Sequence, residues 1–268
     1  MGTWYGRDVT RRMWGAVAAL VAGAGLVAVL TPRGSGSPLR VEDGWSASLF
    51  RSAVEMVAGW PSWAAPVMEV ATDAALITLV VAYTVVSFVT LVRRDVVGLA
   101  GLSLVVVGST VAYGLSEVLK VAVAEERPCR AVVAEVAAHC PEVGDWSFPS
   151  NHSVIAMAIA TGLAMLRPRL AWLWLPLGVL GVVLRVLVGV HYPHDVLAGA
   201  VWGAAGVAAT LLVFAGPLGH VFTFVLTPLS FFAPRPGRHA RRAQAADPRW
   251  SQETRVDLPV FRDDASPR

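Results

Sequence analysis

Six long apolar stretches run through the chain, separated by short polar segments that contain many of the arginines. A helix needs about 20 mostly apolar residues to cross the hydrocarbon core of a bilayer, and most of these stretches approach or exceed that length. We therefore predict an all-α fold, a polytopic membrane bundle of six transmembrane helices. The expected helices cover residues 14–30, 74–92, 96–119, 153–166, 170–190 and 196–218.

The arginines between the stretches predict the orientation of this bundle, because short cytoplasmic loops carry an excess of positive residues. With six helices, every arginine group falls on one side, so both termini are predicted to be cytoplasmic. Residues 31–66, 121–152 and 191–195 then lie on the extracytoplasmic side. The groups are Arg7, Arg11 and Arg12; Arg93 and Arg94; Arg167 and Arg169; and Arg235, Arg238, Arg241 and Arg242.

The same pattern divides the chain into five parts. Residues 1–13 form a cytoplasmic N-terminus, residues 14–66 a first transmembrane helix with an outer interfacial segment, and residues 67–218 a core with five transmembrane helices. The short apolar segment 219–233 is predicted to lie at the membrane interface. The tail 234–268 has too few apolar residues to pack, and we predict that it is disordered in the cytoplasm.

Two features near the N-terminus allow an alternative. The first apolar stretch is also compatible with a cleaved secretory signal, although it is longer than a usual signal core. After it, aromatic and apolar residues recur at spacings near three and four, which predicts either an amphipathic helix at the outer interface or an ordered loop. These residues are Trp45, Phe50, Val54, Val57, Trp60 and Trp63.

The composition supports a membrane protein and excludes other classes. Of the 268 residues, 55% are hydrophobic and 15% charged, whereas a soluble domain carries about 25% charged residues. The net charge of +3 is dispersed between apolar stretches and forms no basic patch, so we expect no nucleic-acid partner. Two cysteines are too few for a disulfide scaffold. Lys120 is the single lysine in the sequence.

Three short segments gather unusual polar residues: 120–128 (KVAVAEERP), 149–152 (PSNH) and 185–195 (RVLVGVHYPHD). In the six-helix topology each lies at the outer end of a helix, so segments far apart in the sequence meet at one depth. Together they supply three cations, two imidazoles, a hydroxyl and a carboxylate. These are Lys120, Arg127 and Arg185; His152 and His191; Ser150; and Asp195.

This set of side chains indicates phosphate chemistry. Guanidinium groups match phosphate oxygens with paired donors, and a lysine adds a compact positive charge. One neutral histidine can attack phosphorus while a second, protonated one donates to the departing oxygen. A carboxylate can hold the other ring nitrogen of the nucleophile. Because this arrangement needs neither a metal nor another cofactor, we expect none.

The spacing of the residues agrees with these roles. His191 and Asp195 are four residues apart, and Pro193 between them is tolerated only in the first turn of a helix. His191 is therefore expected just before the helix, close enough to Asp195 for a hydrogen bond. Ser150 is a plausible N-cap of the fourth helix, whose backbone N–H groups would then point at the anion.

The three segments resemble the signature motifs of the type-2 phosphatidic acid phosphatase superfamily, the membrane lipid phosphate phosphatases related to vanadium haloperoxidases. The motifs are K-x6-R-P, P-S-G-H and S-R-x5-H-x3-D. The chain matches them with Lys120, Arg127 and Pro128; with Pro149, Ser150 and His152; and with Arg185, His191 and Asp195. Asn151 stands at the glycine position of the second motif, and Leu184 at the serine position of the third.

The resemblance implies a role for each matched residue. His191 would be the nucleophile that forms a phosphohistidine, assisted by Asp195, and His152 would be the general acid. The phosphoryl oxygens would be bound by Lys120, Arg127, Ser150 and Arg185, with Asn151 supplying the backbone contact usually made by glycine.

Other polar residues have more ordinary explanations. His194 is expected at the rim of the site or in a structural role, and a metal site of His191, His194 and Asp195 is disfavoured by the nearby cations. Cys129 and Cys140 both lie in the predicted outer loop, where the milieu is oxidising. A disulfide between them would close a short loop beside the cations, which contributes about 3 kcal/mol in the chain-entropy model.

The sequence therefore predicts a multi-pass enzyme of the plasma membrane whose active site faces the extracytoplasmic side. Its expected reaction is hydrolysis of a lipid phosphate, with a polyprenyl pyrophosphate carrier of cell-wall synthesis first among the substrates. Phosphatidic acid and phosphatidylglycerol phosphate are alternative substrates, and a non-catalytic lipid-phosphate binding or transport protein is the alternative class. The expected partners are the lipid substrate and the bilayer, with no obligatory protein partner.

Overall fold

A computed structural model describes residues 7–34, 38–132 and 136–229 of the chain. The predicted disordered tail, 234–268, lies outside these residues. The regular elements of the described part are helical, and its one isolated β-bridge joins Leu39 and Glu125. The helices are α1 (Arg7–Leu30), α2 (Trp45–Ala58), α3 (Ala64–Val92), α4 (Val96–Val123), α5 (Pro128–Ala131), α6 (Asn151–Leu166), the 3-10 turn η1 (Pro168–Leu170), α7 (Ala171–Leu187) and α8 (Pro193–Leu226).

Five of these helices are long and apolar enough to cross a membrane, where the sequence pattern predicts six. They are α1, α3, α4, α8, and α7 together with the turn before it. The sixth candidate, α6, has 16 residues and a length of about 24 Å, shorter than the hydrocarbon core of about 30 Å. The prediction of an all-helical membrane fold is confirmed, while six full-length spans are not.

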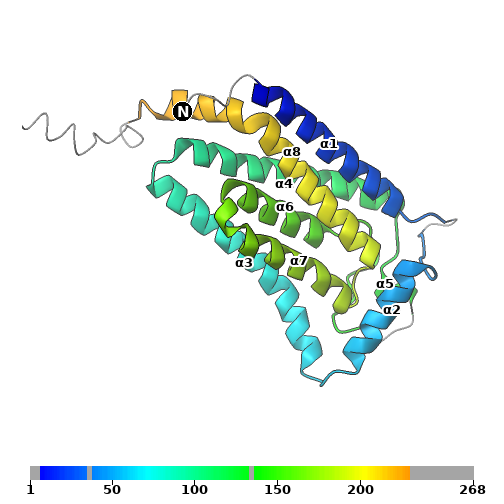
Figure 1. The fold of residues 1–268 in the computed structure, drawn as a ribbon. Coiled ribbons are helices and arrows are strands. Elements are labelled where there is room, and N and C mark those ends of the chain that lie inside the picture. The colour runs from blue at the N-terminus through cyan, green and yellow to red at the C-terminus, as the bar shows by residue number, and fades with distance from the viewer. Residues whose placement is uncertain (1–6, 35–37, 133–135, 230–268) are drawn as a thin grey trace, which may run out of the picture.

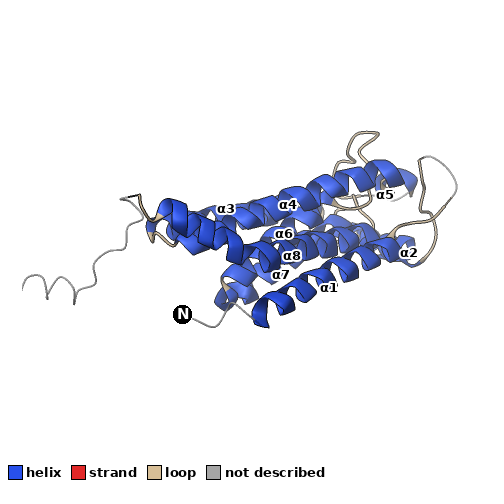
Figure 2. Ribbon diagram, turned by 90° about the horizontal axis from the view of Figure 1, so that it is seen from above, coloured by secondary structure: helices blue, strands red, loops and turns tan. Residues whose placement is uncertain are grey.

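Helix α6 lies in the middle of the bundle, between α4, α7 and α8 (Figures 1 and 2). Its buried side chains are mostly small, which allows the neighbouring backbones to approach closely. A Cβ atom at Gly203 of α8 would lie 2.1 Å from the carbonyl oxygen of Val154, so only glycine fits this crossing. This close packing holds the first turn of α6 against the first turns of α8.

For the segment after α1, the sequence predicts either an amphipathic helix or an ordered loop, and the structure contains a helix, α2. Helix α2 buries Phe50, Val54 and Val57 along one side. Phe50 packs edge-on against Tyr192, with ring centroids 5.5 Å apart. Helix α2 therefore covers the loop between α7 and α8, and it does not lie apart from the bundle.

Of the helices that are longer than the hydrophobic pattern predicts, α3 and α8 extend furthest beyond their predicted ranges. Helix α3 begins at Ala64, ten residues before the expected start, because the polar side chains of Glu69 and Asp73 do not interrupt its backbone. Helix α8 continues through Pro217 to Leu226. Pro217 removes one helical hydrogen bond without ending the helix, so the predicted interfacial segment begins as part of α8.

The ends of four core helices meet at one end of the bundle. Helices α4 and α7 end there, and α6 and α8 begin there, with α2 and α5 beside them (Figure 1). The connections containing Arg93, Arg94 and Arg167 lie at the opposite end (Figure 2). The fold thus brings the three polar segments of the sequence to the same end.

Candidate active site

A cavity of about 500 Å³ opens where these helix ends meet. Three cations and both histidines of the predicted site line it, together with Asn151. Its wall also includes two carboxylates, Glu117 and Asp145. The predicted site residues in the wall are Lys120, Arg127, Asn151, His152, Arg185 and His191.

His191 is held as a neutral imidazole with one nitrogen available toward the cavity. Its Nδ1 lies 3.4 Å from the Asp195 carboxylate and 3.3 Å from the Ser147 hydroxyl, so the ring proton is assigned to this nitrogen. The Nε2 then accepts a hydrogen bond from Arg127 Nη1 at 3.1 Å. Burial and the Arg127 cation lower the pKa of His191 to about 3. A neutral imidazole with an unprotonated nitrogen toward the cavity is the form required of a nucleophile, and Arg127 must release this nitrogen before it can attack.

Asp195 lies behind His191 and is fully buried. Its Oδ2 accepts from the Tyr192 N–H at 2.8 Å and from the Ser147 hydroxyl, in addition to facing His191. Three donors on one oxygen favour the ionised carboxylate. Asp195 therefore fixes both the orientation of the His191 ring and the nitrogen that bears its proton.

Lys120 and Arg127, the cations predicted to bind phosphate, are paired with a carboxylate of the chain itself. Asp145 Oδ1 lies 3.1 Å from Lys120 Nζ, and its Oδ2 lies 2.9 Å from Arg127 Nη2. Although burial opposes it, the charges of Arg127 and Lys120 hold the pKa of Asp145 below its usual value. Asp145 thus binds both cations through separate oxygens, as two phosphate oxygens would.

The remaining cation and the second histidine complete the cavity. Arg185 Nε is buried and has no hydrogen-bond partner among the described residues, which leaves a donor for an anion. His152 Nε2 lies 3.3 Å from Asp73 Oδ1 of α3. The imidazole of His152 is partly exposed at the cavity, with the Asp73 carboxylate as its neighbour.

Two predicted residues at the start of α6 are placed differently from expectation. Ser150 is the N-cap residue, but its side chain makes no capping bond, and its hydroxyl instead accepts from Ser153 at 3.2 Å. Ser150 is fully buried and does not line the cavity. Asn151 donates from Nδ2 to Glu117 and accepts at Oδ1 from Ser116. Since Asn151 has helical backbone, the glycine position of the motif needs no unusual φ here.

The two cysteines form a disulfide that links Cys129 of α5 to Cys140. Arg130 donates to the carbonyl oxygens of Pro141 and Glu142, just beyond the second cysteine. The disulfide and Arg130 therefore tie the loop that contains Asp145 to the segment that contains Arg127.

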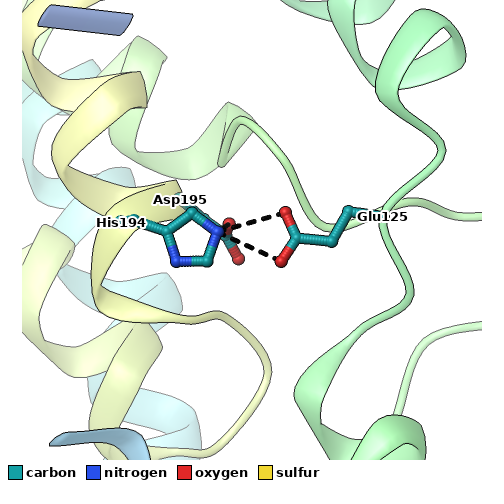
Figure 3. A group of neighbouring side chains, drawn as sticks. All are labelled: Glu125, His194 and Asp195. Atoms are coloured by element: carbon teal, nitrogen blue, oxygen red, sulfur yellow. Dashed lines mark hydrogen bonds and ion pairs between the residues drawn. The ribbon is translucent and has the colours of Figure 1, made fainter. Parts of the chain in front are cut away.

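His194 is buried and does not lie at the rim. Its Nε2 faces two carboxylates, from Glu125 and Asp195, as Figure 3 shows. One ring nitrogen of His194 and one carboxylate oxygen each of Glu125 and Asp195 lie within 4.8 Å of one another, a separation that would also suit a metal ion. His194 Nε2 pairs with Glu125 Oε2 at 3.3 Å, while Glu125 Oε1 and Asp195 Oδ1 have no hydrogen-bond partner among the described residues.

Sequence reasoning missed three residues of this region. Ser147 and Asp145 belong to the outer loop directly before the second motif, and their only signal is that short separation. Glu125 lies two residues before Arg127, inside the first motif, where the motif specifies no residue type. Each of them contacts a predicted site residue that is distant from it in the sequence. The spacing of residues within a motif does not reveal such contacts.

The fold and this cavity define the class of the protein: a multi-pass membrane protein with a cation-lined cavity between helix ends. Residues 98–217 match the family model of the PAP2 superfamily. This match confirms the resemblance of the three motifs to that superfamily. Every residue of those motifs lies within the matched range.

Individual relatives agree with this family. The chain is 37% identical over 103 residues to an undecaprenyl-diphosphatase of Sulfolobus acidocaldarius, which covers 37% of this chain and 48% of the relative. It is 41% identical over 69 residues to a lipid A 1-phosphatase of Rhizobium johnstonii, covering 26% of this chain and 28% of the relative. The chain thus matches less than half the length of these curated relatives.

A solved structure is also similar. It is a transmembrane PAP2 type phosphatidylglycerolphosphate phosphatase from Bacillus subtilis, with 21% sequence identity and a TM-score of 0.49. The similarity covers 80% of this chain and 98% of that one.

Proposed function

We propose that this protein is a lipid phosphatase that hydrolyses a lipid phosphate or polyprenyl pyrophosphate through a phosphohistidine on His191. The observation that supports this most directly is the contact between His191 Nε2 and Arg127 Nη1 at 3.1 Å, at the wall of a cationic cavity. A phosphate held by Arg127 would have its phosphorus beside the nucleophilic nitrogen. His152 lines the same cavity and can serve as the acid.

The reaction proceeds in two displacements. His191 Nε2 attacks phosphorus, a P–N bond forms, and the bond from phosphorus to the leaving oxygen breaks as His152 donates a proton to that oxygen. Water then attacks the phosphohistidine, His152 takes its proton, and the P–N bond breaks to release phosphate. Throughout, Asp195 stabilises the positive charge on the His191 ring.

Three cations neutralise the charge that develops on the phosphoryl oxygens: Lys120, Arg127 and Arg185. The substrate displaces Asp145 from two of them. Ser150 and Asn151 contribute by bringing the first turn of α6, with its backbone N–H groups, to the cavity wall. No metal ion takes part in this scheme.

The first carbons of the lipid tail have a place in a second, apolar groove of about 180 Å³. On α3, α4 and α6, the residues that line the groove lie about one helical turn from residues that line the cation cavity. The neighbours are Val80 and Leu76 on α3, Ser109 or Thr110 and Tyr113 on α4, and Ile159 and Ile155 on α6. One turn is about 5.4 Å, so the two hollows adjoin along the same three helices. A phosphate in the cavity would leave its tail in the apolar groove.

We propose that the site faces the extracytoplasmic side of the plasma membrane. Arg93, Arg94 and Arg167 lie in connections at the other end of the bundle, and positive residues favour the cytoplasm. Reporter fusions after Arg94 and Val121 test this, with the first expected inside and the second outside. A cytoplasmic signal at Val121 would contradict the orientation.

A substrate panel on purified protein in detergent tests the function. Phosphate release is measured from a polyprenyl pyrophosphate, its monophosphate, phosphatidic acid, phosphatidylglycerol phosphate and lipid A. The undecaprenyl-diphosphatase relative favours the pyrophosphate. His191→Ala should abolish release, and EDTA should leave it unchanged. Binding of these lipids without release from any of them would instead identify a non-catalytic binding protein.

A further inference from the structure

Glu125, His194 and Asp195 form a buried cluster (Figure 3), and Asp195 joins this cluster to His191. His194 Nε2 lies 3.1 Å from Glu125 Oε1 and 3.2 Å from Asp195 Oδ1. Glu125 and Asp195 are completely buried, and His194 is 4% exposed. The phosphatase scheme assigns a task to Asp195 but leaves Glu125 and His194 unused.

The cluster must contain one proton beyond those of a neutral imidazole and two carboxylates. Without it, two negative charges would face each other in the interior, at a large cost in desolvation. Asp195 does not take this proton, because its Oδ2 already accepts from Ser147, Tyr192 and His191. Among the described residues, Glu125 Oε1 and Asp195 Oδ1 are buried without a hydrogen-bond partner, and His194 Nε2 reaches Glu125 Oε2 at 3.3 Å. A proton on Glu125 would give both of these oxygens a partner, so we assign the proton to Glu125.

Both side chains are held firmly in place. The Ser46 hydroxyl lies 2.7 Å from His194 Nδ1, and Tyr192 and Phe148 stack on the imidazole. The backbone of Glu125 is fixed on both sides, since its carbonyl accepts from Ser147 N–H and its neighbours pair with Leu39. A cluster with this rigid support keeps one geometry while its proton content changes.

We propose that Glu125 is a positioning residue that stays protonated and, with His194, holds the second oxygen of Asp195, so that Asp195 remains charged and aligned with His191. This role rests on the proposed function of His191. The chain of contacts runs from Glu125 to His194, Asp195 and His191, and it reaches the nucleophile without touching the substrate.

The electrostatic surroundings agree with a protonated Glu125. Burial, followed by the charge of Asp195, raises the pKa of Glu125 to about 8. The titratable groups around Glu125 are the other two members of the cluster, His194 and Asp195 of α8. His191 and Tyr192 of the preceding loop lie next to them. Above the pKa of Glu125 a second buried negative charge appears beside Asp195, which weakens the cluster.

Glu125→Gln tests the proposal, because its amide donates to Asp195 and accepts from His194 but cannot ionise. At neutral pH this variant should keep kcat within about threefold of the wild type, since its hydrogen bonds remain satisfied. Its activity should also lack the alkaline decline of the wild type. Glu125→Ala should lower kcat by about 10- to 100-fold with little change in KM, as expected for loss of a supporting contact.

Thermal stability gives a readout that does not depend on activity. The native state retains a proton on Glu125 that the unfolded chain loses near pH 4.5, so wild-type stability falls as the pH rises toward about 8. The melting temperature of the wild type should therefore fall relative to Glu125→Gln over this range. Glu126→Gln, a change in the neighbouring residue paired with Arg40 and Arg130, should keep the wild-type pH dependence.

Three outcomes would overturn the proposal: melting curves of wild type and Glu125→Gln that stay parallel with pH, loss of kcat in Glu125→Gln equal to that in Glu125→Ala, or stoichiometric zinc binding that Glu125→Gln abolishes. If the wild type releases no phosphate from any lipid, the proposed function fails. The melting curves would then still decide whether Glu125 retains its proton.

Discussion

The carboxylate of Asp145 lies 2.9 Å from the guanidinium of Arg127, in the place expected for a substrate phosphate. The same carboxylate reaches Lys120 at 3.1 Å. Asp145 comes from the loop between the disulfide and α6, and its side chain is 47% exposed, so it can leave the cavity without disturbing buried packing. The binding site is therefore neutralised in part by the chain itself before an anion arrives.

Asp145→Asn should strengthen inhibition by inorganic phosphate, because the anion no longer competes with an internal carboxylate. Because the Asp145 side chain is about half exposed, solvent screening limits its ion pairs to about 1 kcal/mol or less, so we expect the inhibition constant to fall by about three- to fivefold. Inhibition of lipid hydrolysis by added phosphate measures this. Glu142→Gln in the same loop is the matched control, and weaker inhibition of Asp145→Asn would mean that the carboxylate instead orients the cations.

His152→Asn should slow the reaction in a way that depends on the leaving group. Loss of a general acid lowers rates by about 100- to 10,000-fold, and the loss is smaller when the leaving oxygen needs no proton. We expect a large fall in kcat for an alkyl phosphate and a much smaller one for p-nitrophenyl phosphate. Equal losses for both esters would assign His152 to binding.

Ser109→Phe should fill the apolar groove and select against long lipid tails. For a long-chain lipid phosphate, kcat/KM should fall by about 10-fold or more, the scale of discrimination in apolar pockets. A short, water-soluble phosphate ester should be hydrolysed at the wild-type rate. Val107→Phe, an exposed position on the same helix, is the control and should affect neither substrate.

Removal of the disulfide by Cys129→Ser with Cys140→Ser should destabilise the protein by about 2–5 kcal/mol, as for other disulfides that close short loops. Thermal unfolding with and without reductant measures the effect. Reductant should lower the melting temperature of the wild type and leave the double variant unchanged. Equal melting temperatures in wild type and variant would show that Arg130 alone holds the loop.

The burial of neutral His191 predicts a loss of stability in acid. Its pKa is about 3 in the folded protein and near 6.5 in an unfolded chain, so between these values the unfolded state binds one more proton. Stability should therefore fall as the pH drops below about 6.5, by up to about 1.4 kcal/mol per pH unit from this residue. Comparison of melting curves for the wild type and His191→Gln isolates the effect, and identical acid slopes would contradict it.

The sequence alone determined the membrane class, the helical fold and most of the polar side chains that line the cationic cavity. Apolar length fixes which segments can cross a bilayer, and the spacing of His191, Pro193 and Asp195 fixes their geometry across one helix start. These features depend on neighbours within a turn or two of helix, so they can be predicted without the fold. The sequence predicts a transmembrane helix where the structure has the short helix α6. An apolar pattern of this kind is also typical of a helix buried among other helices.

Only the tertiary structure decided which residues support and occupy the site. Asp145 reaches Lys120 and Arg127 from a separate loop, Ser147 joins His191 to Asp195, and Glu125 meets His194 from the end of another helix. It also turned the hydroxyl of Ser150 away from the cavity and the amide of Asn151 toward Glu117. The physical reason is that such contacts join residues separated by tens of positions, and their distances are set by how closely the helices pack.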